Sequence, residues 1–423
     1  MKKSIYYDLY NKGYENKELS KIVNDANAYK NRNPINEEIK VQVGNGMLWQ
    51  QLILAWPMKQ VLILLLAALV LGCSADSATI EDSADTPDNI VLMIGDGMGL
   101  SSVSLGFYFQ DKPSQFSRFR HIGLARTSSA KQKITDSAAA GTAMACGVKT
   151  YNGAIGVDTL KTEIPSITEL VSSLGWSTGV VATSSVAHAT PASFYAHVPR
   201  RGMTDEIAEQ LLQSDIDFFA GGGKKFFNAR KDGQNLFLLA KEKGFVIDTL
   251  SLAQSGSLDP RMKYGFMPVA DKMPPALKGR GDFLPRATSL AMDHLSNNEQ
   301  GFFLMVEASQ IDGAGHANDI EYSIGEQLDF EEVIKNALDF AEKDGNTLVV
   351  VTADHETGGL GLSSKINPET GRRDYREIEP GFVYDGHTAT LVPVFAYGPG
   401  AEEFTGIYEN TEIFWKMKAL IEE

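Results

Sequence analysis

The chain has 423 residues, of which 43% are hydrophobic and 22% are charged, a composition typical of a globular protein. This length allows one large α/β domain with insertions, and the sequence contains no repeats and no long low-complexity tract. The formal net charge of −15 disfavours nucleic acid as a partner, because phosphates repel an acidic surface.

Residues 1–57 are polar, rich in Asn, Lys and Tyr, and lie upstream of what resembles a natural start at Met58. Two interpretations stay open for this extension. Its initiation codon is misassigned, or it is a genuine cytoplasmic segment. In the second case Leu52–Leu71 would be an internal membrane anchor, interrupted by Pro57 and Lys59.

Residues 58–73 have the features of an export signal, because the apolar run Val61–Gly72 has the size of a signal-peptide h-region. The run ends in Val70-Leu71-Gly72-Cys73, which resembles a bacterial lipobox, in which the cysteine carries lipid and becomes the new N-terminus. The alternative is a plain signal peptide that ends at Cys73. Residues 74–88 would then form a polar, acidic tether. We expect an exported protein, periplasmic or in the cell envelope, whose membrane contact is a lipid anchor on Cys73.

Removal of residues 1–73 would make the protein more acidic. That segment contains 9 of the 39 basic and 6 of the 54 acidic residues, so 30 against 48 would remain, a net charge of −18. Cys146 would be the only remaining thiol, and no internal disulfide could form.

From Asn89 to the C-terminus, strand-like and helix-like patterns alternate. This alternation predicts a single α/β domain over residues 89–423, with a mostly parallel central sheet flanked by helices on both faces. Ser255–Gly281 and Ser363–Asp385 are expected to be surface insertions, and Glu331-Glu332 to lie on a solvated helix face. The expected strands are Asn89–Ile94, Ile122–Arg126, Thr178–Thr183, Asp217–Ala220, Gly301–Val306, Thr347–Thr352 and Val394–Tyr397. The expected helices are Ile164–Ser173, Thr204–Leu212, Leu236–Lys243, Pro285–Leu295, Ile324–Glu342 and Thr411–Ile421.

Acidic residues follow three of the β-rich apolar runs at the point where each run ends. They are Asp96, Glu307 and the pair Asp354-His355. Ligands of open α/β folds bind at the carboxyl ends of the strands, so these side chains predict a cluster of divalent metals there. Asp312, His316 and His387 add the mixture of oxygen and imidazole ligands that suits zinc beside a harder ion. The alternative is that each acid only caps a turn.

Ser137 is a candidate nucleophile. It follows Thr135-Asp136 and opens a run of small residues expected to be a helix, where free backbone N–H groups and the helix dipole favour an anion. The alternative is an ordinary Thr or Asp N-cap with Ser137 as a bystander. No G-x-S-x-G motif is present to activate a serine through histidine, so activation would have to come from a metal.

Together these pieces resemble the alkaline phosphatase family, in the family's order and over the whole exported domain. The matching segments are Ile94–Gly99, Thr135–Ala139, Lys149–Gly153, Ala189–Ala192 with Ala196–Val198, Phe302–Glu307 through His316, Thr352–His355 and Gly386–Thr388.

The resemblance implies two zinc ions and a third ion, usually magnesium. One zinc would be held by Asp312, His316 and His387, and the other by Asp96, Asp354 and His355. The third ion would use Asp96, Thr190 and Glu307. His188 is a further candidate metal ligand. It stands where the best-known enterobacterial pattern has Asp, and Gly313 stands where that pattern has Lys, so the identity of the third metal stays open.

The resemblance also implies the reaction. Ser137 would take the phosphoryl group from a monoester, water would release it at alkaline pH, and Arg201 would clamp it by two parallel hydrogen bonds. Arg200 competes with Arg201 for this role. The family implies a homodimer and small phosphomonoester substrates. A sulfatase would need a C-x-P-x-R motif, which is absent; a related phosphodiesterase and a metal- or phosphate-binding lipoprotein without turnover are the other hypotheses.

Overall fold

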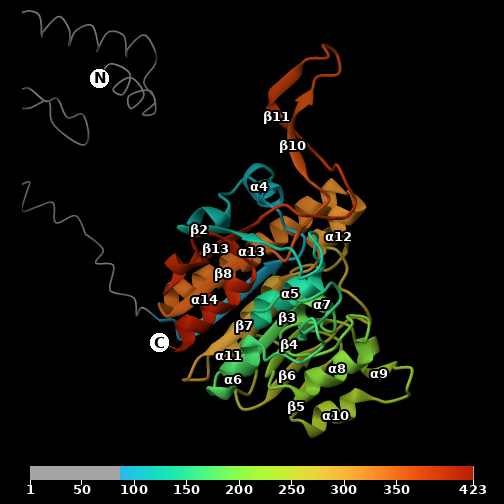
Figure 1. The fold of residues 1–423 in the computed structure, drawn as a ribbon, viewed down its shortest axis with the longest axis vertical. Helices are drawn as coiled ribbons and strands as arrows, with labels where there is room; N and C mark the ends of the chain where they lie inside the picture. The colour runs from blue at the N-terminus through green and yellow to red at the C-terminus, as the bar shows by residue number, and fades with distance from the viewer. Residues whose placement is uncertain (1–85, 423) are drawn as a thin grey trace, which may run out of the picture. The chain divides into compact units, whose positions relative to one another are not determined.

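The computed structural model describes residues 86–422. A ten-stranded sheet forms the centre, in the order β14-β2-β13-β8-β1-β7-β3-β4-β6-β5 (Figure 1). All its strand pairings are parallel except the two that β13 makes with β2 and β8. The sheet is therefore mostly parallel, as predicted. Its strands are β1 Asn89–Gly95, β2 His121–Arg126, β3 Ser177–Ser185, β4 Phe218–Gly222, β5 Phe245–Asp248, β6 Lys263–Phe266, β7 Phe302–Ala308, β8 Thr347–Thr352, β13 Val392–Tyr397 and β14 Gly406–Glu409.

Strands β1, β7 and β8 lie side by side and are buried over their whole lengths. Their continuous apolar sequences follow from this position, because both faces of a parallel sheet are covered. Ile94 pairs with Glu307 on one side and with Thr352 on the other. The carboxyl ends of the three strands are thus level, and the acidic residues that end them meet at one edge.

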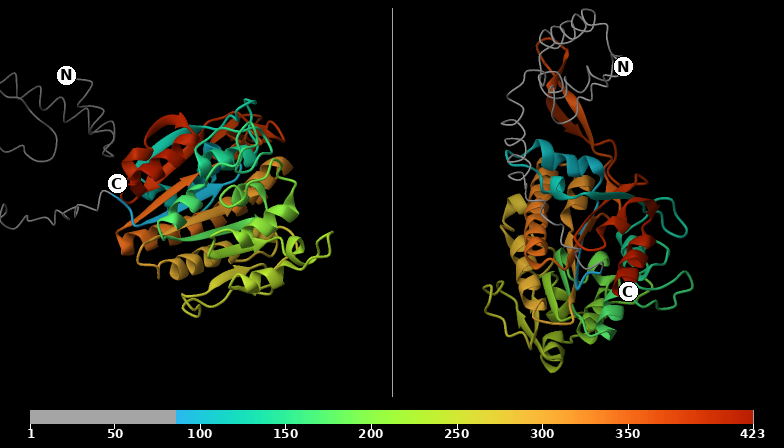
Figure 2. Two further views of the ribbon diagram at one scale, coloured as in Figure 1. Left: turned by 60° about the horizontal axis from the view of Figure 1, so that its bottom comes forward. Right: turned by 90° about the vertical axis from the view of Figure 1, so that its left-hand side faces the viewer.

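Helices cover both faces of the sheet, as predicted. Helices α11 and α13 pack on one face, and α6, α7 and α14 lie with α5 on the other (Figure 2). Local signals set several helix ends; for example, Ser166 and Glu169 form a capping box at the start of α6. The helices are α4 Leu100–Tyr108, α5 Ser137–Cys146, α6 Ile167–Ser173, α7 Ala189–Ala192, α8 Thr204–Gln213, α9 Lys225–Asn228, α10 Leu236–Glu242, α11 Phe283–Leu295, α12 Gln310–Ala317, α13 Ile320–Asp344 and α14 Thr411–Glu422.

Of the two predicted surface insertions, one lies outside the central sheet and the other contributes a strand to it. Residues 363–385 lie outside the central sheet. Those up to Gly381 belong to the hairpin formed by β10 (Gly361–Ile366) and β11 (Arg373–Gly381), which projects from the body in Figure 1. The prediction for Ser255–Gly281 was wrong in part, because this stretch contains β6, an inner strand between β4 and β5. The four residues of β6 are too few to show an alternating pattern in the sequence.

Two smaller expectations also need correction. Glu307 lies inside β7 rather than after it. Glu331 is only 1% exposed, and its carboxylate accepts hydrogen bonds from Ser114 Oγ at 2.6 Å and from the backbone N–H of Gln115 at 2.8 Å. A buried carboxylate is tolerated here because these donors satisfy it, which helix periodicity could not reveal.

The predictions for residues 1–57, for the signal at 58–73 with Cys73, and for the tether up to residue 85 lie outside the described residues. Among residues 86–422, none of the helices combines the length and the apolar character needed to cross a membrane.

Candidate metal centre and active site

The acidic ends of the central strands converge on helix α12. Asp96 follows β1, and the next residue, Gly97, has a φ of +77°. A Cβ on Gly97 would lie 2.6 Å from the Cα of Asp312, so only glycine allows this turn to approach the helix so closely. The turn is also held by Asp354, whose Oδ1 accepts the N–H of Gly97 at 3.1 Å.

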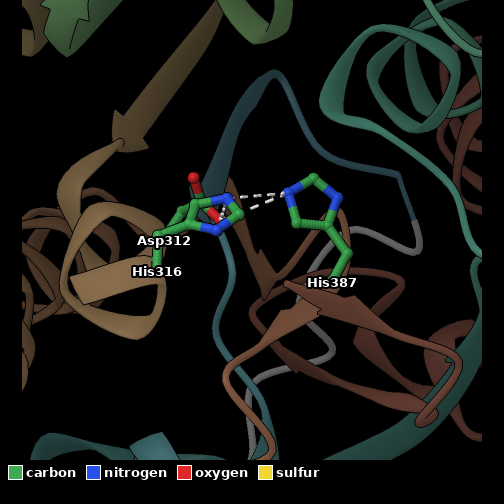
Figure 3. A group of neighbouring side chains, drawn as sticks. All are labelled: Asp312, His316 and His387. Atoms are coloured by element: carbon green, nitrogen blue, oxygen red, sulfur yellow. Dashed lines mark hydrogen bonds and ion pairs between the residues drawn. The ribbon is translucent and has the colours of Figure 1, made fainter. Parts of the chain in front are cut away.

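Asp312, His316 and His387 form the first group of potential metal ligands (Figure 3). The Nε2 atoms of His316 and His387 lie 3.3 and 3.5 Å from Asp312 Oδ1 and 3.2 Å from each other. The Nδ1 atoms face backbone carbonyls, of Asp385 at 2.6 Å and of Thr135 at 2.9 Å. These carbonyls fix both rings with Nε2 toward Asp312, the usual arrangement around a metal-binding histidine.

His355 is the centre of the second group. Its Nε2 lies 3.5 Å from Asp96 Oδ1, 3.3 Å from Asp354 Oδ2 and 3.3 Å from Ser137 Oγ. Asp312 also comes within ligand range of Asp96 and His355, so it lies between the first and second groups. The nucleophile predicted from the sequence therefore lies against the second predicted zinc site.

The third group consists of Asp96, His188 and Glu307. The Oε2 atom of Glu307 accepts hydrogen bonds from Ser309 Oγ at 2.5 Å and from Ser184 Oγ at 2.9 Å. Its other oxygen has no partner among the described residues. The sequence places both Thr190 and His188 among the candidate metal ligands, and the structure brings His188 within ligand range of Asp96 and Glu307.

Burial shifts the pKa of most of these groups toward the uncharged form. It raises the pKa of Asp354 to about 6, with the charge of Asp312 adding to the effect, and that of Glu307 to about 7. The pKa of Asp96 is well above its usual range for the same reason. Burial lowers the pKa of His355 to about 3 and that of His188 to about 4. Divalent cations are what would stabilise so many carboxylates in their charged form.

Several ligand atoms in this region are buried and have no hydrogen-bond partner within residues 86–422. Buried polar atoms are normally paired, so a set of unpaired ones gathered at one place indicates ligands for cations. Carboxylate oxygens and imidazole nitrogens are the donor types that zinc and magnesium take, and the residues therefore fit the predicted metals. The unpaired atoms are Asp96 Oδ1, His188 Nδ1, Thr190 Oγ1, Glu307 Oε1 and Asp354 Oδ2.

Ser137 is the first residue of α5 and is 2% exposed. Asp136 caps this helix, since its Oδ1 accepts the N–H of Ala139 at 3.1 Å. The aspartate N-cap considered in the sequence analysis is thus present, and Ser137 Oγ lies 3.3 Å from His355 Nε2.

Arg201, not Arg200, is the arginine that lies at the site. Its Nη1 donates to Asp136 Oδ2 at 3.0 Å, and its Nη2 lies 3.0 Å from His188 Nε2. The side chain of Arg200 is exposed and makes no hydrogen bond among the described residues.

Residues that orient the ligands were missed from the sequence. Thr357 donates to Asp312 Oδ1 at 2.6 Å and lies 3.2 Å from His355 Nδ1. Ser184 and Ser309 act in the same way on Glu307. Serine and threonine are common and carry no spacing signal, so the sequence offered no means of finding them.

Residues 87–377 match the family model described as alkaline phosphatase. The chain belongs to the alkaline phosphatase family. It is 34% identical to alkaline phosphatase 4 of Bacillus subtilis, over 79% of this chain and 89% of that protein. It is 33% identical to the alkaline phosphatase of Escherichia coli, over 82% of this chain and 88% of that protein.

Among solved structures, alkaline phosphatase from the Antarctic bacterium TAB5 is 50% identical to this chain, with a TM-score of 0.78, and the match covers 80% of this chain and 98% of that chain. Two variants of the TAB5 enzyme, in which a histidine is replaced by Glu or by Asp, have magnesium bound in the M3 site. The predicted fold and family are thus confirmed. This chain is an alkaline phosphatase, a phosphomonoesterase.

Proposed function

We propose that this enzyme hydrolyses phosphate monoesters to an alcohol and inorganic phosphate through a phosphoserine on Ser137. The observation that carries the proposal is the position of Ser137 Oγ, 3.3 Å from His355 Nε2 at the start of a buried helix. A hydroxyl in this place is close both to potential metal ligands and to the anion-binding end of the helix.

Three divalent cations belong to the proposed site, namely two zinc ions and a third that is magnesium in most of the family. Asp312, His316 and His387 would hold the first zinc. Asp96, Asp354 and His355 would hold the second. Asp96, Glu307, Thr190 and His188 would surround the third, whose identity depends on His188. Bound there, the zinc ions would lower the pKa of the serine hydroxyl and stabilise the entering and leaving oxygens of the displacement.

The chain's own residues supply the rest of the chemistry. Ser137 Oγ forms a bond to phosphorus while the ester P–O bond breaks, and the alcohol leaves with a proton. Water then attacks phosphorus, the serine is restored, and phosphate is released. Two inversions give net retention at phosphorus. The helix N-terminus at Ser137 and the guanidinium of Arg201 favour the phosphoryl anion in both steps.

The ion pair between Arg201 and Asp136 supports the proposed role of Arg201 as the phosphate clamp. Asp136 holds its Nη1 at 3.0 Å, which limits the rotamers that the long side chain can adopt. Because Asp136 also caps α5, the clamp and the nucleophile are aligned by a single side chain.

The cellular setting is proposed from the sequence alone. The apolar run ending at Cys73 and the acidic tether after it support an exported enzyme, periplasmic or in the cell envelope, anchored through lipid on Cys73. A homodimer is proposed from the resemblance.

The proposal is tested with Ser137→Ala. Monoesterase activity on p-nitrophenyl phosphate should fall to nearly nothing, while zinc content stays close to two per chain, since the proposed protein ligands remain. Wild-type activity should disappear with EDTA and return with zinc. Retained phosphoenzyme labelling in Ser137→Ala would show that another residue is the nucleophile.

A further inference from the structure

A short loop, Val269–Met273, is fixed at the edge of the sheet that carries the site. Its backbone carbonyls accept hydrogen bonds from the N–H groups that follow β4: Val269 from Lys224, Ala270 from Lys225, and Asp271 from Gly223 at 2.8 Å. A Cβ on Gly222 would lie 1.8 Å from the carbonyl oxygen of Asp271, so glycine is needed for this approach.

The other end of the loop is joined to the elements that hold the proposed metal ligands. The N–H of Met273 donates to the carbonyl of Thr183 at 3.0 Å, next to Ser184, which binds Glu307. Its carbonyl accepts Gln310 Nε2 at 2.7 Å. Gln310 is buried and begins α12, the helix of Asp312 and His316. The loop is thus part of the rim of the site.

Lys272 lies between these two anchored ends. Its side chain is exposed, and within residues 86–422 its ammonium group makes no hydrogen bond or ion pair, whereas the nearby Lys225 pairs with Asp271. The next residue, Met273, is hydrogen-bonded to Thr183 and Gln310, so Lys272 lies at the end of the loop nearest the proposed metal ligands. Its ammonium group is available to bind an anion at the rim of the site.

Ser137 and Lys272 lie at different depths, so they would contact different parts of the substrate. Ser137, which would receive the phosphoryl group, is 2% exposed, whereas Lys272 is at the surface. A cation at the rim is suited to the part of the substrate that extends outward, the alcohol portion. We propose that Lys272 forms a second anion-binding position, which selects phosphomonoesters whose alcohol portion carries another anionic group, a carboxylate or a second phosphate.

This inference rests on the proposed function. It concerns binding only and adds no step to the reaction. An exposed ion pair contributes about 1 kcal/mol or less, so the selectivity should be about three- to fivefold.

The test compares substrates matched except for the additional anion. The carboxylate pair is 3-phosphoglycerate against glycerol 3-phosphate, and the phosphate pair is fructose 1,6-bisphosphate against fructose 6-phosphate. Lys272→Met should lower kcat/KM for the first member of a pair by about three- to fivefold and leave the second unchanged. Lys272→Arg should keep the preference. Lys278→Met, which removes an exposed lysine farther along the same stretch, is the control and should change neither.

A result in which Lys272→Met lowers kcat/KM equally for both members would overturn the proposal, because Lys272 would then act on the transferred phosphoryl group. No change for any substrate would overturn it as well. Affinities of the same compounds, measured calorimetrically in a Ser137→Ala background with and without Lys272→Met, test the position without turnover. These affinities distinguish a failure of the proposed anion-binding position from a failure of the proposed reaction.

Discussion

Asp136 joins the proposed nucleophile to the proposed phosphate clamp. Its Oδ1 accepts the N–H groups of Ala139 and Gly153 at 3.1 and 3.0 Å, and its Oδ2 accepts Arg201 Nη1. An aspartate is required for this, because asparagine offers one acceptor oxygen where three donors arrive. The pair Asp136–Arg201 therefore sets the direction of the guanidinium before substrate binds.

Arg201→Ala should weaken the enzyme much more than Arg200→Ala. A charge-assisted hydrogen-bonded contact contributes about 1.5–3 kcal/mol, so kcat/KM for monoesters should fall by about 10- to 100-fold and inhibition by phosphate should weaken. Arg200 is exposed, and its removal should change kcat/KM by less than about threefold. Steady-state kinetics with phosphate as inhibitor measure both. If Arg200→Ala is the more damaging change, the clamp has been assigned to the wrong arginine.

His188→Asp should tighten magnesium at the third site. Burial lowers the pKa of His188 to about 4, so at neutral pH the imidazole is uncharged and offers a softer nitrogen. A carboxylate there adds negative charge and an oxygen ligand, which octahedral magnesium prefers. Titration of metal-stripped enzyme with magnesium at saturating zinc measures the change, with His121→Asp as the control. Equal magnesium dependence in variant and wild type would mean that residue 188 does not tune this site.

At the scale of elements, helix α5 is made of small residues because it is buried on every side. A Cβ on Gly141 would lie 2.7 Å from the Oγ of Ser193, the residue that ends α7, so glycine at this position favours the close approach of the two helices. This close packing brings Ser137 to the carboxyl edge of the sheet. The small residues of α5 therefore help to position Ser137 in the site.

The hairpin β10–β11 interrupts the metal-binding region without disturbing it. It connects β9 (Glu356–Thr357) to β12 (His387–Thr388), and these two strands still pair, with His387 opposite Thr357. Gly358 closes the base of the hairpin, donating to the carbonyl of Gly386 and accepting the N–H of Val383. His387 thus stays next to Thr357, although the hairpin lies between them in the sequence.

An ion pair between Glu169 and His197 links α6 to the segment after α7, and the stability that it contributes should depend on pH. His197 lies 3.2 Å from Glu169 Oε1, which raises the pKa of His197 and lowers that of Glu169. The histidine's stabilisation is complete below its unfolded pKa and is lost as the pH rises through the folded value. That of the glutamate is present above its unfolded pKa and is lost as the pH falls through the folded value.

His197→Gln should therefore destabilise most between about pH 4.5 and 6.5, the unfolded values of Glu and His. Because Glu169 is partly exposed, the maximum should be below about 1 kcal/mol. Urea unfolding of variant and wild type at pH 4, 5.5 and 8 measures it, and His121→Gln is the control. A difference that grows toward pH 8 would contradict the assigned ion pair.

At the scale of the whole molecule, the net charge of the exported portion bears on how the protein would be held at a membrane. The exported portion is expected to carry a net charge of −18, from 30 basic and 48 acidic residues. Such a surface is repelled by an anionic membrane, so a covalent lipid is a more effective anchor than surface attraction.

Cys73 should carry that lipid. Expressed in a bacterial host, the wild-type chain should incorporate labelled palmitate and sediment with membranes, whereas Cys73→Ala should do neither. Cys146→Ala is the matched control, since this thiol is buried and should not be modified. Equal labelling of wild type and Cys73→Ala, or none in either, would leave an exported enzyme without the anchor.

The sequence by itself determined the fold class and the residues that the site brings together. Buried parallel strands need continuous apolar runs, so β1, β7 and β8 were visible from composition, and the acids at their ends followed directly. Ser137 was visible because a helix start has local signals. The resemblance to alkaline phosphatases added the grouping of ligands, which local patterns do not contain.

Tertiary structure alone decided which neighbours orient those residues. Thr357 beside Asp312, Ser184 beside Glu307 and Lys272 at the rim all depend on the approach of segments that are distant in the chain. The same holds for the burial of Glu331 and the insertion of β6 between β4 and β5. Hydrogen bonds between distant segments leave no periodic pattern in a sequence, because their energy depends on distance and direction in the folded state.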